Sequence, residues 1–282
     1  MNTNWIPLNK IPDTRLYDAR GQLHQAAQLL AATGISYVPH RADDSHTAML
    51  WSAEKHEFQS QSFGEQFQIA LDPADLNLNI NKAGKSIHKL ELNGITLSQA
   101  SGRLQQLLED EGLPKNVFTM KKHYDLPDYP DRWDRDFDSS DTEAFQVLAN
   151  SYNNAFLELD QIANVYSRAG DLLIWPHHFD LGLLITVAED EQGNLSKSIG
   201  VGMSPGDGSY TAPYYYVTVW PAPTLDQISS GLKSAGEWHS KDWIGMVLSF
   251  GKIASEDGSI RQNSVTREYL EEALSVAEAL SR

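Results

Sequence analysis

The stretch WPHHFDLG at residues 175–182 sets two adjacent histidines in an apolar run, and imidazole suits both acid–base chemistry and metal binding near neutral pH. If residues 172–188 form one extended strand, successive side chains point to opposite faces. His177 then falls in an apolar row and is expected to be buried and hydrogen-bonded. His178 falls on the opposite, mixed face, so the two imidazoles cannot share one ion unless a bulge at Pro176 breaks the register.

The mixed face also carries Asp180, and two rises of a strand put its backbone about 6.5 Å from that of His178. A carboxylate at this range can fix the tautomer of an imidazole, as in acid–base sites. His178 and Asp180 are therefore the candidate catalytic pair of a hydrolase or lyase. The alternative is a polar pair at a strand edge with no chemical role.

A second stretch, PYYYVTVWPAP at residues 213–223, alternates between an apolar row and a row of large rings. In an antiparallel sheet it could lie beside residues 175–182, so that the mixed faces of both strands line one cavity. Rings with a few polar tips are typical of small-molecule sites, and the alternative is burial of both faces under helices. His178 and Asp180 would orient the ligand, and the residues expected to contact it are Trp175, Tyr214, Tyr216 and Trp220.

Metal chemistry has a weaker basis in the sequence. Cysteine is absent, which excludes thiolate ligands and disulfides. Glu237, His239 and Asp242 could join His178 around a zinc or hard metal ion, but the chain has neither an HExxH nor a His-x-His spacing. We therefore expect no cofactor and no stoichiometric divalent metal, with Glu237 and His239 as outside candidates for completing a metal-assisted catalytic site.

Charge and composition restrict the partners. The 282 residues carry a net charge of −16, whereas nucleic acids and anionic membrane surfaces attract a basic face. Neither is an expected partner, and a small organic ligand remains the candidate. The chain opens without an apolar core of signal-peptide length, and no run approaches the roughly 18 apolar residues of a membrane span. We expect a soluble, cytoplasmic protein, and the oligomeric state stays open.

Hydrophobic periodicity places the elements of the first half of the chain. A helical pattern ends near Gly34, two alternating runs predict strands with one solvated face, and Thr96 with Gln99 has capping-box spacing. The expected elements are a helix over residues 15–32, strands over 67–71 and 76–81 joined by a turn at 72–75, and a helix beginning at Thr96.

Residues 121–141, KKHYDLPDYPDRWDRDFDSSD, are expected to form an acidic linker, because repeated Asp and Pro favour neither helix nor strand. Asp134, Asp136 and Asp138 have the spacing of a calcium loop. However, Ser139 and Phe145 occupy the positions where such a loop requires glycine and glutamate. A solvated linker is the better interpretation.

The second half repeats the order helix, strands, helix. A helix is expected from Ser140 with Glu143 in capping-box position, followed by strands over residues 172–188, 197–203, 213–220 and 243–250, and a helix over 264–280. Strands clustered between helices predict an α+β fold with antiparallel sheets. The predicted domains are two similar halves, residues 1–120 and 142–282, packed as one unit on either side of the linker. Internal duplication is a hypothesis, since the letters do not repeat.

The chain resembles an uncharacterised bacterial family whose members carry a Trp-Pro-His-His-Phe-Asp or Trp-Gly-Ser-Phe-Asp strand. The resemblance covers nearly the whole chain and rests on TR at 14–15, QLHQAAQ at 22–28, FQIALDP at 67–73, IWPHHFDLG at 174–182, PYYYVTVWPAP at 213–223 and WHSKDWIGMVL at 238–248. It implies no activity. It does imply that His177 and His178 are dispensable in some members, whereas Trp175, Phe179 and Asp180 fit both forms of the motif.

Three functions stay open on these grounds. The leading one is a protein that binds a small organic ligand in an aromatic-lined cavity. The second is a hydrolase or lyase that uses His178 with Asp180, with or without a metal. The third is a structural or partner-binding protein without a pocket.

Overall fold

The computed structural model describes residues 4–127, 135–228 and 231–282. Contacts divide the chain into two compact units that are not consecutive in sequence. Unit 1 contains residues 1–10, 150–172 and 180–282, and unit 2 contains residues 11–149 and 173–179. This division differs from the predicted one, because residues 121–141 lie within the range of unit 2 and the chain crosses between units elsewhere. Asp134 of the calcium-like spacing lies outside the described residues, as does the middle of the predicted linker.

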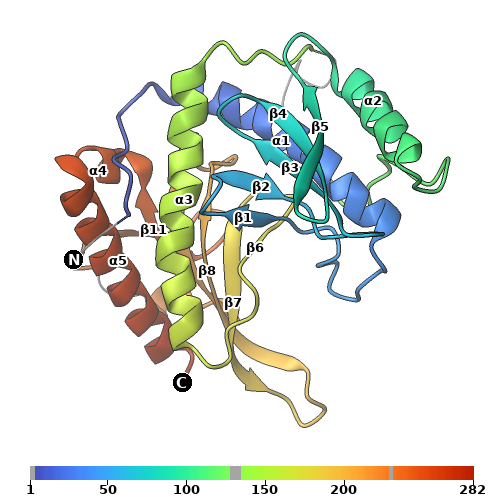
Figure 1. The fold of residues 1–282 in the computed structure, drawn as a ribbon. Coiled ribbons are helices and arrows are strands. Elements are labelled where there is room, and N and C mark those ends of the chain that lie inside the picture. The colour runs from blue at the N-terminus through green and yellow to red at the C-terminus, as the bar shows by residue number, and fades with distance from the viewer. Residues whose placement is uncertain (1–3, 128–134, 229–230) are drawn as a thin grey trace. The chain divides into compact units, whose positions relative to one another are not determined.

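Unit 2 is built on an antiparallel meander in the order β1-β2-β3-β4-β5 (Figure 1). Its helices and strands are α1 (Asp13–Tyr37), β1 (Leu50–Ser52), β2 (Glu57–Gln59), β3 (Phe67–Asp72), β4 (Asn77–Lys82), β5 (Lys85–Glu91), α2 (Leu97–Asp110), the start of α3 (Thr142–Val165) and β6 (Leu173–Ile174). The predicted burial of the apolar row is confirmed, because Ile69 pairs with Ile80 and all four of Ile69, Leu71, Leu78 and Ile80 are buried. The predicted solvated face is wrong in part, because Ala70, Asn77 and Asn81 on the opposite row are buried as well.

Two helices cover this sheet, α1 against β3 and α2 against β5, and they also contact each other. The capping box of α2 is confirmed: Thr96 Oγ1 accepts from the Gln99 N–H, and the Gln99 side chain accepts from the Thr96 N–H. Gly34 does not end α1, which continues to Tyr37. Instead, a Cβ atom at Gly34 would collide with the carbonyl oxygen of His46. Glycine is needed there for the close approach of a loop.

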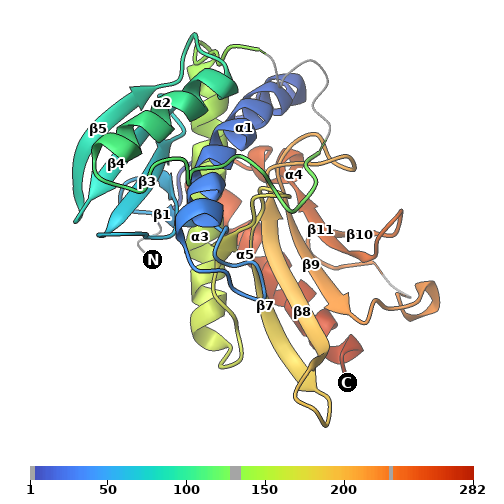
Figure 2. The ribbon, with the colours of Figure 1, turned by 90° about the vertical axis from the view of Figure 1, so that its right-hand side faces the viewer.

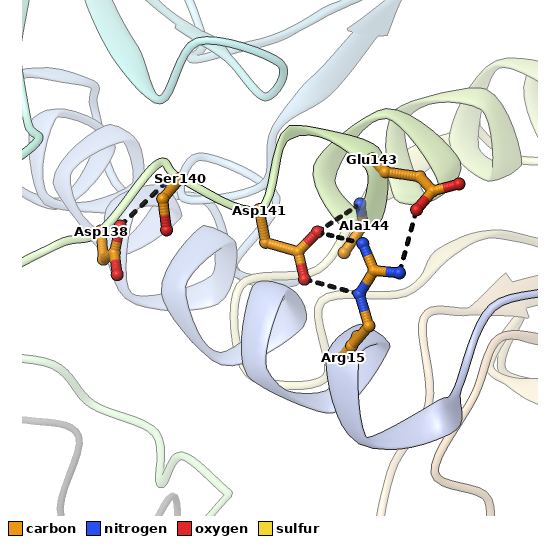
Figure 3. A network of polar contacts seen from close by, with 6 residues as sticks. All are labelled: Arg15, Asp138, Ser140, Asp141, Glu143 and Ala144. Atoms are coloured by element: carbon orange, nitrogen blue, oxygen red, sulfur yellow. Dashed lines mark hydrogen bonds and ion pairs between the residues drawn. The ribbon is translucent and has the colours of Figure 1, made fainter.

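A bidentate ion pair connects the start of α1 to the start of α3 (Figure 3). Arg15 donates to both carboxylate oxygens of Asp141 at 2.9 and 2.6 Å, and its third nitrogen lies 2.9 Å from Glu143. Asp141 also accepts from the Ala144 N–H at 3.2 Å, so it caps α3 one residue after the predicted start at Ser140. Glu143 pairs with Arg15 instead of closing a capping box. The guanidinium holds the pKa of Asp141 below its usual range.

Unit 1 contains a second antiparallel sheet, in which strands follow the order β10-β11-β9-β8-β7. Helix α5 packs against β8, β9 and β11 and lies behind them in Figure 2. The elements of unit 1 are the rest of α3, β7 (Leu181–Glu189), β8 (Leu195–Ser204), β9 (Tyr214–Trp220), a short 3-10 turn (Leu225–Gln227), β10 (Glu237–His239), β11 (Gly245–Ser249), α4 (Phe250–Ala254) and α5 (Gly258–Leu280).

Both units combine helices with an antiparallel sheet, so the predicted α+β class is confirmed. The hypothesis of internal duplication stays a prediction, and the strand orders of the two sheets differ. Within the described ranges, no helix combines the length and the apolar character needed to cross a membrane.

Candidate functional site

The histidine-bearing stretch is a turn and not a strand. β6 ends at Ile174, β7 begins at Leu181, and the Phe179 N–H donates to the Trp175 carbonyl at 2.7 Å. Phe179 adopts a φ of +58°, a conformation that is rare for a bulky residue. The prediction of one strand over residues 172–188 is therefore wrong, and strand parity does not separate the two histidines.

The inward residues of this turn are Pro176 and Phe179, and they are held by α1. Phe179 is 1% exposed and stacks on the His24 ring at 4.9 Å and against Phe58 at 5.1 Å. His24 Nε2 donates to the Pro176 carbonyl at 2.7 Å, and the Gln28 amide donates to the same oxygen at 2.9 Å. Burial lowers the pKa of His24 to about 4, so its ring is neutral near neutral pH.

His177 and His178 lie side by side at the surface of unit 2, with ring centroids 4.2 Å apart. His177 is half-buried and His178 is exposed, so the predicted core histidine is wrong. The buried imidazole beside this stretch is that of His24, which lies on α1. Burial, together with the nearby His178 and His123, lowers the pKa of His177 to about 4. Its ring lies 6.0 Å from that of Tyr124.

More histidines converge on the same part of unit 2. In the described part of the chain, one group of three potential metal ligands has its donor atoms within 4.8 Å of one another: His40, Asp44 and His46. His123 joins from a distant segment, with its Nε2 3.3 Å from Asp44 Oδ1 and its ring 6.1 Å from that of His46. We call His40, Asp44, His46, His123, His177 and His178 the histidine cluster.

The sequence analysis missed this group of ligands. Its local signal is HRADDSH at residues 40–46, in which an aspartate and two histidines are spaced for a short loop. His46 is 4% exposed, and burial, followed by the neighbouring His40, lowers its pKa. A buried imidazole that stays neutral is the form that coordinates metals.

A different polar array lies on the sheet of unit 1. Tyr216 of β9 pairs with Gly202 of β8, which in turn pairs with Gly182 of β7. A Cβ atom at either glycine would collide with the Tyr216 hydroxyl, so the ring lies directly across these two backbones. The Tyr216 hydroxyl donates to Asp180 Oδ2 at 2.5 Å. Burial, reinforced by Asp180, raises the Tyr216 pKa well above its ordinary value.

Further aromatic residues extend this array along the sheet. Tyr214 donates to Asp207 at 2.7 Å, and its ring lies 4.6 Å from Tyr210 and 6.4 Å from Tyr216. His239 Nε2 faces the Lys241 carbonyl at 2.5 Å and therefore carries the proton, so Nδ1 accepts from the Tyr210 hydroxyl at 3.0 Å. Trp243 stacks on His239 at 4.2 Å. We call the whole array the tyrosine face: Asp180, Asp207, Tyr210, Tyr214, Tyr216, His239 and Trp243.

The structure brings together only part of the predicted ligand site. Asp180, Tyr214 and Tyr216 lie on the tyrosine face. Trp220, the last residue of β9, is 60% exposed. Trp175 and His178 belong to unit 2, so the pairing of His178 with Asp180 stays a prediction.

The outside metal candidates have other partners. Both ring nitrogens of His239 are engaged, as described above. Glu237 forms an ion pair with Lys252 at 3.3 Å. A role of either residue in metal binding stays a prediction.

Three hollows in the described part of unit 1 do not match the predicted cavity. A void of about 10 Å³ beside Tyr214 and Tyr215 has room for about one water molecule. A groove of about 410 Å³ runs between α3 and α5, and another of about 760 Å³ lies between α5 and a segment that contributes Gln227, Ile228 and residues 231–234. No residue of the tyrosine face lines either groove.

Comparison of the chain with protein-family models, with curated proteins and with solved structures found no match. The resemblance to an uncharacterised bacterial family therefore stays a prediction.

Proposed function

We propose that the protein binds a small organic molecule on the tyrosine face of unit 1. The observation that carries this proposal is the placement of Tyr216 over Gly182 and Gly202 with its hydroxyl bonded to Asp180. Two glycines in adjacent strands lose side-chain packing and conformational restriction, which weakens a sheet. Their presence is accounted for by the space that the Tyr216 ring requires.

The chemistry of the face indicates the class of ligand. The half-buried rings of Tyr210 and Trp243 offer flat apolar area with polar edges, which suits stacking against a ring-shaped molecule. Asp180 and Asp207 are acceptors that favour hydroxyl or amino groups. A cyclic polyol or an aromatic amine fits both requirements. The net charge of −16 also favours neutral or cationic ligands over anionic ones.

The experiment is a binding screen on the full chain with two matched variants. Cyclic polyols and aromatic amines would be titrated while tryptophan fluorescence and the melting temperature are followed. Tyr216→Phe should weaken binding of any hit at least about tenfold, the effect of losing a bond worth about 1.4 kcal/mol. Tyr215→Phe, on the opposite side of the same strand, should leave binding unchanged. Equal affinity of wild type and Tyr216→Phe, or the absence of any hit, contradicts the proposal.

The second candidate function is a metal-assisted hydrolase or lyase. The observation in its favour is the histidine cluster, which gathers imidazoles and a carboxylate at one place on unit 2. The predicted acid–base pair of His178 and Asp180 would have to act together with it. The cytoplasmic location expected from the sequence remains a proposal beside these two functions.

A further inference from the structure

We propose that His40, Asp44, His46 and His123 form a binding site for a divalent first-row transition metal, with zinc as the reference ion. The site lies in unit 2 and is independent of the ligand proposed for the tyrosine face. Three imidazoles and one carboxylate make a donor set that suits Zn²⁺, Co²⁺, Ni²⁺ or Fe²⁺. Calcium and magnesium require several oxygen ligands, and this group has one carboxylate.

For three of the four ligands, the distances require only a small movement of the side chains. Donor atoms of His40, Asp44 and His46 lie within 4.8 Å of one another. Ligands at about 2.0 Å from a tetrahedral ion are roughly 3.3 Å apart, so a contraction of the side chains completes the site. His40 and Asp44 can make this movement because their side chains are 75% and 47% exposed. His46, in contrast, is buried and acts as the fixed ligand.

The backbone around His46 is held in place by α1. Gly34 lets the His46 carbonyl approach the helix more closely than any side chain would permit. The Asp43 carboxylate accepts from both the backbone N–H and the hydroxyl of Ser45, at 3.1 and 2.8 Å. His46 Nδ1 accepts only a long 3.4 Å bond from the Arg41 N–H, which a metal can displace at small cost.

The pairing of Asp44 is the second observation that indicates a cation. Among the described residues, Asp44 Oδ1 lies 3.6 Å from His40 Nε2 and 3.3 Å from His123 Nε2. Two imidazoles from separate segments therefore converge on one carboxylate oxygen, Asp44 Oδ1, beside a third imidazole. A metal ion placed among these groups satisfies all four lone pairs at once, which no proton can do. His123 Nε2 lies 3.3 Å from Asp44 but its ring is 6.1 Å from that of His46, so His123 would complete a four-coordinate shell by moving towards the other three ligands.

The test is zinc binding to full-length, tag-free protein that has been stripped with a chelator. Isothermal titration with zinc chloride and elemental analysis after dialysis should give one equivalent. The cobalt-loaded protein should show the intense visible absorption of a tetrahedral N/O site. Asp44→Asn and His40→Ala change exposed side chains, so they should fold as the wild type does, and each should weaken binding at least about 100-fold. His123→Ala should do the same and should abolish the tetrahedral cobalt spectrum.

A matched control is His88→Ala, because His88 is a half-buried histidine of unit 2 on β5 that lies outside the cluster. It should retain one equivalent of zinc with unchanged affinity. His46→Gln removes the buried ligand and should also lose zinc binding. A melting curve of this variant shows whether it is folded. Absence of zinc binding, or full retention of it by both Asp44→Asn and His40→Ala, overturns the site. Unchanged affinity in His123→Ala overturns the assignment of the fourth ligand.

Discussion

The hydroxyl of Tyr216 donates a 2.5 Å hydrogen bond to Oδ2 of Asp180, the last residue before β7. The bond links the central strand of the unit 1 sheet to the segment that leaves the histidine-bearing turn. The adjacent tyrosine on β9, Tyr215, points to the other side of the sheet, and its buried hydroxyl has no hydrogen-bond partner among the described residues. The two neighbours therefore allow a direct comparison of a made bond and a missing one.

Removing each hydroxyl should have opposite effects on the free energy of unfolding. Tyr216→Phe removes the hydrogen bond to the Asp180 carboxylate and should cost about 1–3 kcal/mol. Tyr215→Phe removes a buried hydroxyl that forms no hydrogen bond among the described residues, so the change should be neutral or slightly stabilising. Urea titrations at one pH decide the comparison. Equal losses in the two variants would mean that the bond to Asp180 contributes nothing specific.

The glycines beneath Tyr216 should not tolerate a methyl group. Gly202→Ala would bring Cβ against the Tyr216 ring and the Leu181 carbonyl, and overpacking of this kind costs about 1–3 kcal/mol. Gly208→Ala is the control, since nothing lies within 4 Å of a Cβ there, and its stability should change by less than about 0.5 kcal/mol. Near-ultraviolet circular dichroism should also change in Gly202→Ala, because the ring must move. An unchanged spectrum and stability would contradict this packing.

Stability should fall as the pH is lowered from 6.5 towards 4. The buried ring of His24 has its pKa lowered to about 4, below the ordinary 6.5, with Arg20, His177 and His178 also disfavouring its charge. The unfolded chain therefore binds an additional proton in this window, and the folded state loses up to roughly 3 kcal/mol across it. His24→Gln keeps a donor for Pro176 but cannot titrate, so its stability should depend less on pH. Denaturant titrations at pH 7.5 and 4.5 measure this slope, and identical slopes in the two proteins would exclude His24 as the cause.

The N-cap of α3 should contribute more than the ion pair beside it. Asp141→Ala removes the cap on Ala144 together with the bidentate contact to Arg15, and loss of a cap costs about 1–2 kcal/mol. Glu143→Ala removes only an exposed ion pair and should have a clearly smaller effect. Thermal melts of both variants in low salt provide the measurement. A larger loss in Glu143→Ala would show that the cap of Figure 3 is unimportant.

Local sequence determined the elements whose signals are local. The Thr96 capping box, the alternation of β3 and β4 and the ring row of β9 all follow from side-chain spacing within a few residues. Such patterns predict elements well because hydrogen bonds along a helix or strand fix the periodicity of its faces. The sequence also singled out Tyr214, Tyr216 and Asp180 as candidates, and the structure places these three side chains together on one sheet.

Contacts between distant residues decided the rest. A proline and a left-handed Phe179 break the predicted strand, and this conformation is retained because Phe179 is buried against His24 and Phe58. The histidine cluster gathers a loop after α1, a segment near residue 123 and the turn at 175–179, and no spacing in the sequence joins them. Which side chains meet across such separations depends on the packing of the folded chain, where burial free energy outweighs local conformational preference.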